Sequence, residues 1–213
     1  MGDAEDRQRA RATWQFRAFG VDTGEETADH DAIFLARTAV DDRAAAVWQR
    51  SVDAPGEAGD RVDGHFLDLL SAFNAAEVRY LIVGAYAVGV HGHPRATKGL
   101  ELWIEASPEN AARAVNALRA FGAPIGDLRP SGFASPGPGF TMGDPPRRIG
   151  VLTQIDGVEF ADVFPRAIEA KFGGVPTRVI GLDDLIANKR SAARLQDLAD
   201  VRALERLRKL TGG

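Results

Sequence analysis

The chain has 213 residues, of which 45% are hydrophobic and 26% are charged, and its formal net charge at pH 7 is −4. This length and composition are typical of one globular domain with a sizeable core plus an appendage. No apolar run approaches the roughly 20 residues that a membrane span needs, and the N-terminus lacks the apolar centre of a signal peptide, so we expect a cytoplasmic protein without membrane contact. The absence of cysteine excludes disulfides and thiolate metal sites.

The first 60 residues differ from the rest and are predicted to form an N-terminal arm and linker. Residues 1–29 mix charges, glycines and isolated aromatic residues without a sustained period. Residues 31–50 place apolar side chains at steps of three or four, which predicts a helix with a thin apolar stripe. Residues 51–61 combine proline, glycine and acidic residues, which is typical of a linker. A tail without catalytic importance and a partner-binding arm both fit this pattern.

Residues 61–213 are predicted to form one domain that opens with a helix and a buried strand. Asp63 is a suitable N-cap, and four apolar residues at helical spacing follow it: Phe66, Leu69, Leu70 and Phe73. The helix is expected to end near Asn74. The strand formers of Tyr80–Val83 come next and are stopped by Gly84, which predicts a strand and a glycine turn.

A second strand and a second helix follow this turn. Between residues 99 and 105, apolar residues alternate with others, so that one strand face is apolar and the opposite face carries Gly99, Glu101 and Trp103. The next helix is predicted after Ser107, since Pro108 suits a first helical position and Gly122 suits the residue after a helix end.

The remaining elements complete a mixed sheet flanked by helices, which is an α+β fold. Residues 123–146 hold six of the eleven prolines and are predicted to be a long loop. A third strand is expected at 148–154, and a hairpin is expected at 168–179, around Gly173 and Gly174. The C-terminal residues 181–210 have helical periodicity, and a break is expected near residues 191–195.

Four segments, spread over about residues 63–207, together resemble a known family. They are VRYLIVGAYAVGVHGHPRATK, MGDPPRRI, GGVPTRVI and DLIANKRSAARLQDLADVRALE. In this order they resemble the bacterial nucleotidyltransferase superfamily with the DNA polymerase β-like fold, in particular proteins related to abortive-infection toxins. The resemblance implies a nucleotidyltransferase-like mixed sheet with a C-terminal helical segment.

The resemblance also implies a catalytic site, at which this sequence departs from the family's pattern. Relatives use Mg²⁺ ions held by Asp-x-Asp on the second strand and by a third acid on a later strand, because carboxylates are hard ligands suited to Mg²⁺. Here Gly99 and Glu101 stand at the Asp-x-Asp positions, and Gly150 stands at the third. Glu101 is therefore the one candidate catalytic residue and metal ligand, and Gly99 and Gly150 are degenerate acid positions.

Phosphate binding is predicted at a second set of residues. Gly84 and Ala85 open a short helix whose free N–H groups suit a phosphate, and a plain strand-to-helix turn is the alternative. Arg95 and Lys98 precede the second strand, where they are either phosphate ligands or solvated loop charges. The resemblance implies that Lys189 points towards the nucleotide.

Two other groups of polar residues are expected to have no part in catalysis. Asp197 and Asp200 are interpreted as exposed charges of the last helix. His91 and His93 are too few for a zinc site, and His91 is interpreted as a packed loop residue.

The expected function is that of a nucleotidyltransferase-fold protein that has lost efficient metal-dependent transfer and retains binding of a nucleotide or a partner. The alternative is a slow or altered enzyme, toxin-like, that uses Mg²⁺ to move a nucleoside monophosphate from a nucleoside triphosphate to RNA or protein. A gene product without present function is a third, weaker interpretation. An antitoxin-like partner would fit the resemblance, and the residues leave its existence open.

Overall fold

The computed structural model describes residues 62–145 and 147–211, together with short pieces of the N-terminal region. These pieces are residues 7–9, 11, 14, 16–19, 40 and 42–44. The described residues form a mixed α+β fold, as the sequence predicts. Among them no helix is long and apolar enough to cross a membrane.

The described strands form a seven-stranded sheet of order β1-β4-β5-β3-β2-β7-β6. Their bounds are β1 Phe16–Phe19, β2 Tyr80–Val83, β3 Gly99–Ile104, β4 Gly139–Met142, β5 Arg148–Leu152, β6 Ile168–Phe172 and β7 Val175–Val179. The pairs β3–β5 and β2–β7 are parallel, and the other neighbouring strands are antiparallel. The predicted mixture of strand directions is therefore confirmed.

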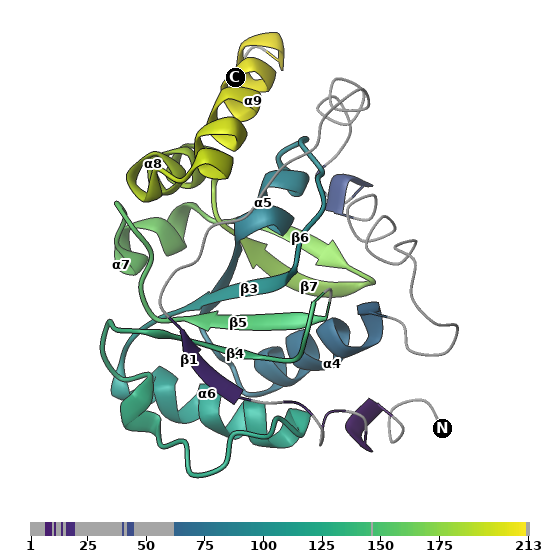
Figure 1. The fold of residues 1–213 in the computed structure, drawn as a ribbon, viewed down its shortest axis with the longest axis vertical. Helices are drawn as coiled ribbons and strands as arrows, with labels where there is room; N and C mark the ends of the chain where they lie inside the picture. The colour runs from purple at the N-terminus through teal and green to yellow at the C-terminus, as the bar shows by residue number, and fades with distance from the viewer. Residues whose placement is uncertain are drawn as a thin grey trace.

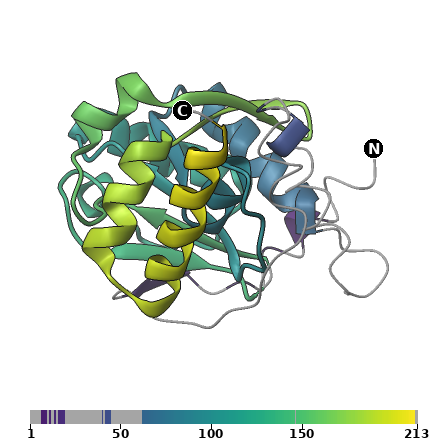
Figure 2. The ribbon, with the colours of Figure 1, turned by 90° about the horizontal axis from the view of Figure 1, so that it is seen from above.

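Helices cover the sheet on two sides. Their bounds are α4 Val62–Ala75, α5 Gly84–Val90, α6 Pro108–Phe121, α7 Phe160–Val163, α8 Leu182–Ala192 and α9 Leu195–Thr211, with 3₁₀ turns at Pro130–Gly132 and Phe164–Arg166. In the view of Figure 1, α6 lies below the strands, α4 lies beside β4 at the lower right, and α5, α8 and α9 lie above. Figure 2 shows α8 and α9 side by side as a helical pair.

Most predicted elements are confirmed, and their ends follow local chemistry. Ser107 caps α6 by accepting a hydrogen bond from the backbone N–H of Asn110 at 3.3 Å, and Gly122 ends this helix in the left-handed conformation. The hairpin turns at Gly173 and Gly174, as predicted. The predicted N-cap of α4 is wrong, because the helix begins at Val62 and Asp63 lies inside its first turn.

The predicted loop at 123–146 is wrong in part, because it contains β4. This strand pairs with β5 along Phe140–Met142, so the pairing partner, rather than the local composition, makes the segment extended. The N-terminal region contributes β1, which pairs with β4 at the edge of the sheet. The predicted helix at 31–50 lies outside the described residues except for residue 40 and residues 42–44, which are helical.

Candidate functional site

The glycine turn after β2 lies directly beneath the carboxylate of Glu101. Val83, the last residue of β2, pairs with Glu101 of β3. Gly84 then opens α5 with a φ of 65°, a conformation that side-chain-bearing residues rarely adopt. A Cβ atom at this position would lie 1.9 Å from Glu101 Oε2. Glycine is therefore required at position 84 for two reasons: the turn has a positive φ, and the carboxylate of Glu101 fills the space that a side chain would occupy.

Two further glycines lie beside Glu101, and they differ in the room around them. Gly150 of β5 pairs with Glu101 of β3. A Cβ atom at position 150 would make an ordinary contact of 3.6 Å with Glu101 Cγ. Gly99 has a φ of 158°, and a Cβ atom there would lie 1.8 Å from the carbonyl oxygen of Arg148. An acid therefore fits this backbone at position 150 but not at position 99, unless β3 and β5 move apart.

Of the three predicted acid positions, only that of Glu101 carries a carboxylate. Its side chain is half-buried and makes no hydrogen bond or ion pair there. No group of three or more His, Asp or Glu side chains that could hold a metal ion occurs among the described residues. One carboxylate can share an ion with phosphate oxygens, but it does not organise two ions.

Two of the predicted phosphate ligands are held by acids of α9. Arg95 makes a two-pronged ion pair with Asp200, with its Nε 2.8 Å from Oδ1 and its Nη2 2.9 Å from Oδ2. The Nζ of Lys189 lies 2.7 Å from Asp200 Oδ2 and 2.8 Å from Asp197 Oδ1. We call these four residues the Asp200 cluster. It joins the loop before β3 to both C-terminal helices.

The Asp200 cluster is buried, so the prediction of exposed acids at these positions is wrong. Asp200 is 0% exposed, and Lys189 and Asp197 are buried beside it. Burial alone raises the pKa of Asp200, but the ion pairs with Arg95 and Lys189 outweigh it and hold the pKa below its usual value. The two cations and two carboxylates of the cluster neutralise one another, and Arg194 lies 3.7 Å from Asp197 Oδ2 at its edge.

The third predicted phosphate ligand, Lys98, differs from the other two. It is exposed and makes no ion pair within the described residues. Arg95 uses its remaining donor Nη1 for the carbonyl oxygen of Ala96 at 3.0 Å. Of the three predicted cations, Lys98 therefore keeps its charge available, while Arg95 and Lys189 do not.

His91 is packed, as predicted. Its Nε2 donates a hydrogen bond of 2.8 Å to the carbonyl oxygen of Ile180, which joins the end of α5 to the chain between β7 and α8. Burial lowers its pKa to about 4, because a charged imidazolium is disfavoured away from water. The ring is therefore neutral at pH 7, with its proton on Nε2.

Sequence reasoning missed the partners in the Asp200 cluster, although a signal for them was present. Asp200, Leu204 and Leu207 follow one another at helical spacing, so this acid lies on the apolar stripe that α9 buries. An acidic residue on a buried stripe needs a buried cation.

The comparisons with known proteins do not identify a family for this chain. No protein-family model matches the chain, and no curated protein matches it either. The assignment of a function therefore depends on the residues themselves.

Proposed function

We propose that the protein has a nucleotidyltransferase-like fold, has lost efficient Mg²⁺-dependent nucleotidyl transfer, and retains binding of a nucleotide or a macromolecular partner. Three features support the fold assignment. Strand β2 leads through a glycine turn into a short helix, β3 places Glu101 over that turn, and β5 runs parallel to β3 with Gly150 beside Glu101. This is the order of elements that the resemblance predicts.

The observation that carries the proposal is that no group of three or more metal-ligating side chains occurs among the described residues, Glu101 included. Two-metal transfer requires ions about 3.5–4 Å apart, which need several carboxylates around one point. Gly150 supplies no side chain, and the backbone at Gly99 has no room for one. With one half-buried carboxylate in place of three, efficient stabilisation of the charge on a triphosphate is not expected.

The charges around the turn argue against tight binding of a nucleotide. A triphosphate at Gly84 would meet the carboxylate of Glu101, which lies on the turn. It would gain Arg95 and Lys189 only by displacing Asp200, which holds both cations at 2.7–2.9 Å. Of the three predicted cations, Lys98 alone has no acidic partner within the described residues, so nucleotide binding is expected to be weak.

The slow enzyme remains the second candidate because of one feature of Glu101. Its carboxylate has no partner in the described part of the chain and faces the turn where a phosphate would bind. It would therefore share a Mg²⁺ ion with phosphate oxygens if an acceptor in RNA or protein were brought alongside.

A transfer assay with α-labelled nucleoside triphosphates separates the two candidates. The purified protein is incubated with Mg²⁺ and RNA or protein acceptors, and nucleotide binding is measured in parallel with and without Mg²⁺. The proposal predicts no label above background and weak binding that is independent of Mg²⁺. It also predicts no label with the Glu101→Gln variant, and nucleotide binding that is no weaker there, because the carboxylate that faces the turn is neutralised.

The control for Glu101→Gln is Glu109→Gln, which neutralises an exposed acid on α6. Mg²⁺-dependent labelling that is lost in Glu101→Gln but kept in Glu109→Gln would contradict the proposal and establish the slow enzyme.

A further inference from the structure

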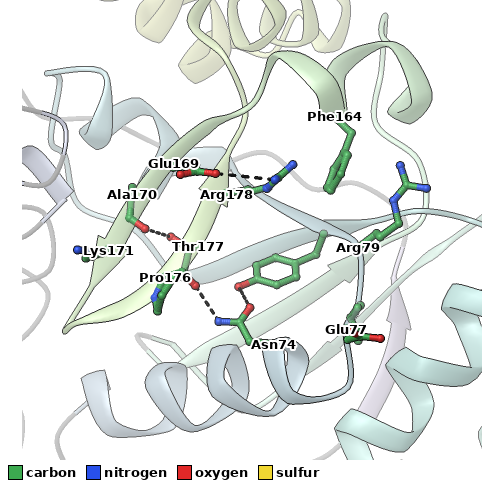
Figure 3. A pocket seen from close by; sticks show the side chains of 12 residues that line it. Asn74, Glu77, Arg79, Phe164, Glu169, Ala170, Lys171, Pro176, Thr177 and Arg178 are labelled. Carbon is green, nitrogen blue, oxygen red and sulfur yellow. Dashed lines mark hydrogen bonds and ion pairs between the residues drawn. The ribbon is translucent and has the colours of Figure 1, made fainter.

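A cavity lies at the opposite end of β2 from the glycine turn. It has a volume of about 830 Å³ and lies between the end of α4, the start of β2, Phe164 and the β6–β7 hairpin (Figure 3). Tyr80, which lines it, pairs with Ile104, whereas Val83 at the other end of β2 pairs with Glu101. Sites for small organic molecules are commonly clefts of roughly 300–1,000 Å³. We call this cavity the Phe164 pocket.

The side chains at the floor of the Phe164 pocket are held in place by hydrogen bonds to one another and to the backbone. The Tyr80 hydroxyl donates to Asn74 Oδ1 at 3.0 Å, and Asn74 Nδ2 donates to the carbonyl oxygen of Pro176 at 2.7 Å. The Thr177 hydroxyl donates to the carbonyl oxygen of Ala170 at 3.2 Å. These bonds join β2 to α4, α4 to β7 and β7 to β6, and they leave a preformed, largely neutral surface on which the organic part of a ligand would pack.

Two arginines from different strands are held at the same aromatic ring. The guanidinium carbons of Arg79 and Arg178 lie 4.6 Å and 4.8 Å from the centre of the Phe164 ring. In the view of Figure 3 they lie on either side of Phe164. Cation–π contacts of this kind stabilise the positions of both guanidinium groups. The ring therefore gathers positive charge at one wall of the pocket.

The charge at this wall is only partly neutralised. Arg79 is paired with Glu105 at 2.8 Å. Arg178 pairs with Glu169 at 3.8 Å, and this glutamate is 85% exposed, so the contact is loose. Lys171 lines the same pocket, is exposed and makes no ion pair within the described residues.

We propose that the Phe164 pocket binds a small organic anion through a carboxylate or phosphate group. Arg178 binds the oxyanion with its planar fork of N–H donors, and Arg79, on the other side of the Phe164 ring, adds positive charge nearby (Figure 3). The organic body packs over Tyr80 and the backbone of the hairpin. An inorganic ion alone would leave most of the cavity unfilled.

The surroundings favour a small molecule over a nucleic acid. Glu77 and Glu169 line the same cavity, so the surface around the arginines is of mixed sign. The chain as a whole carries a formal charge of −4. A polyanion generally requires a continuous basic surface, whereas a single oxyanion requires one local cluster of donors.

Titration calorimetry with four probes tests this proposal. Phenyl phosphate and benzoate combine an oxyanion with an organic body, phenol lacks the anion, and inorganic phosphate lacks the body. At least one of the first two is expected to bind at least ten-fold more tightly than phenol and inorganic phosphate. The tighter of phenyl phosphate and benzoate identifies the oxyanion as phosphate or carboxylate.

Variants of Arg178 place the binding in the pocket. Arg178→Gln is expected to lower the affinity for the tighter-binding probe at least ten-fold. Arg178→Lys is expected to give an intermediate affinity, because lysine keeps the positive charge but lacks the planar fork of donors. Arg119→Gln, which removes an exposed arginine on α6, is the matched control and is expected to change nothing. Circular dichroism checks that each variant is folded.

The proposal is overturned if neither phenyl phosphate nor benzoate binds, or if Arg178→Gln binds the tighter probe as well as the unmodified protein does. The outcome is independent of the proposed function, because Glu101 lies on β3 opposite Val83, at the other end of β2 from the pocket. This variant is expected to bind the same probe unchanged.

Discussion

The strand face at Glu101 and the Asp200 cluster contain the same kinds of charged group in opposite circumstances. Glu101 is a half-buried carboxylate without a partner in the described residues, and glycines surround it. Asp200 is fully buried and binds two cations at 2.7–2.9 Å. The first region has a carboxylate without cations, and the second has cations whose charge is already neutralised.

This difference explains why residue types alone do not define a catalytic site. Arg95 and Lys189 resemble phosphate ligands in the sequence, but in the structure they join the loop before β3 and α8 to α9. Their ion pairs are stabilising only while Asp197 and Asp200 stay in place, because a buried charge without a partner is strongly unfavourable. The helical layer therefore depends on charges that a nucleotide would need.

The largest effect is expected from Asp200→Asn. This change leaves Arg95 and part of the charge of Lys189 uncompensated in a buried site, so the free energy of unfolding should fall by about 3–5 kcal/mol. Urea denaturation measures it. The control is Asp183→Asn, which removes an exposed partner of Arg208 and should cost less than about 1 kcal/mol. Equal losses in the two variants would show that the cluster is not structural.

Acidification tests the helical layer through His91. Its pKa is about 4 in the folded protein and 6.5 ordinarily, so the unfolded chain binds a proton in this range and the folded chain does not. Stability is therefore lost as the pH falls from about 6.5 to 4, by at most about 3 kcal/mol. Urea midpoints at pH 7.5 and 4.5 measure the loss.

The control is His91→Gln, which keeps an N–H donor near Ile180 and does not titrate. This variant should lose less stability over the same interval. Asp200 does not contribute to the interval, because a lowered carboxyl pKa leads to a loss of stability only below its usual range. An equally steep loss in the variant would mean that His91 is not the group responsible.

The smallest effect is expected on the strand face, from a matched pair of glycine substitutions. Gly99→Ala brings a methyl group against the carbonyl oxygen of Arg148 and should destabilise by about 1–3 kcal/mol. Gly150→Ala makes an ordinary contact with Glu101 and should change stability by less than about 0.5 kcal/mol. Thermal unfolding compares the two. If both variants are equally stable, the strands have more freedom than the structure indicates.

Much of the fold follows from the sequence because its signals are local. The buried strand before Gly84, the caps of α6 and the glycine hairpin each depend on residues close to one another in the chain. Strand β4 was missed, since its extended conformation depends on pairing with β5.

The site was less predictable, because its decisive contacts join distant segments. Arg95 and Asp200 are 105 residues apart in the chain, and no periodicity indicates that they meet. The lack of room at Gly99 depends on how closely β5 approaches. The Phe164 pocket joins residues from Asn74 to Arg178, so its two arginines appear in the sequence as unrelated surface charges.

Counting bound metal ions tests the central claim most directly. Mn²⁺ serves as a paramagnetic substitute for Mg²⁺, and its electron paramagnetic resonance signal is titrated with protein in the presence of a non-hydrolysable nucleoside triphosphate analogue. The account predicts no Mn²⁺ bound beyond the amount that the free analogue takes up, both in the unmodified protein and in Glu101→Gln. Two ions bound per chain, and lost in Glu101→Gln, would contradict it.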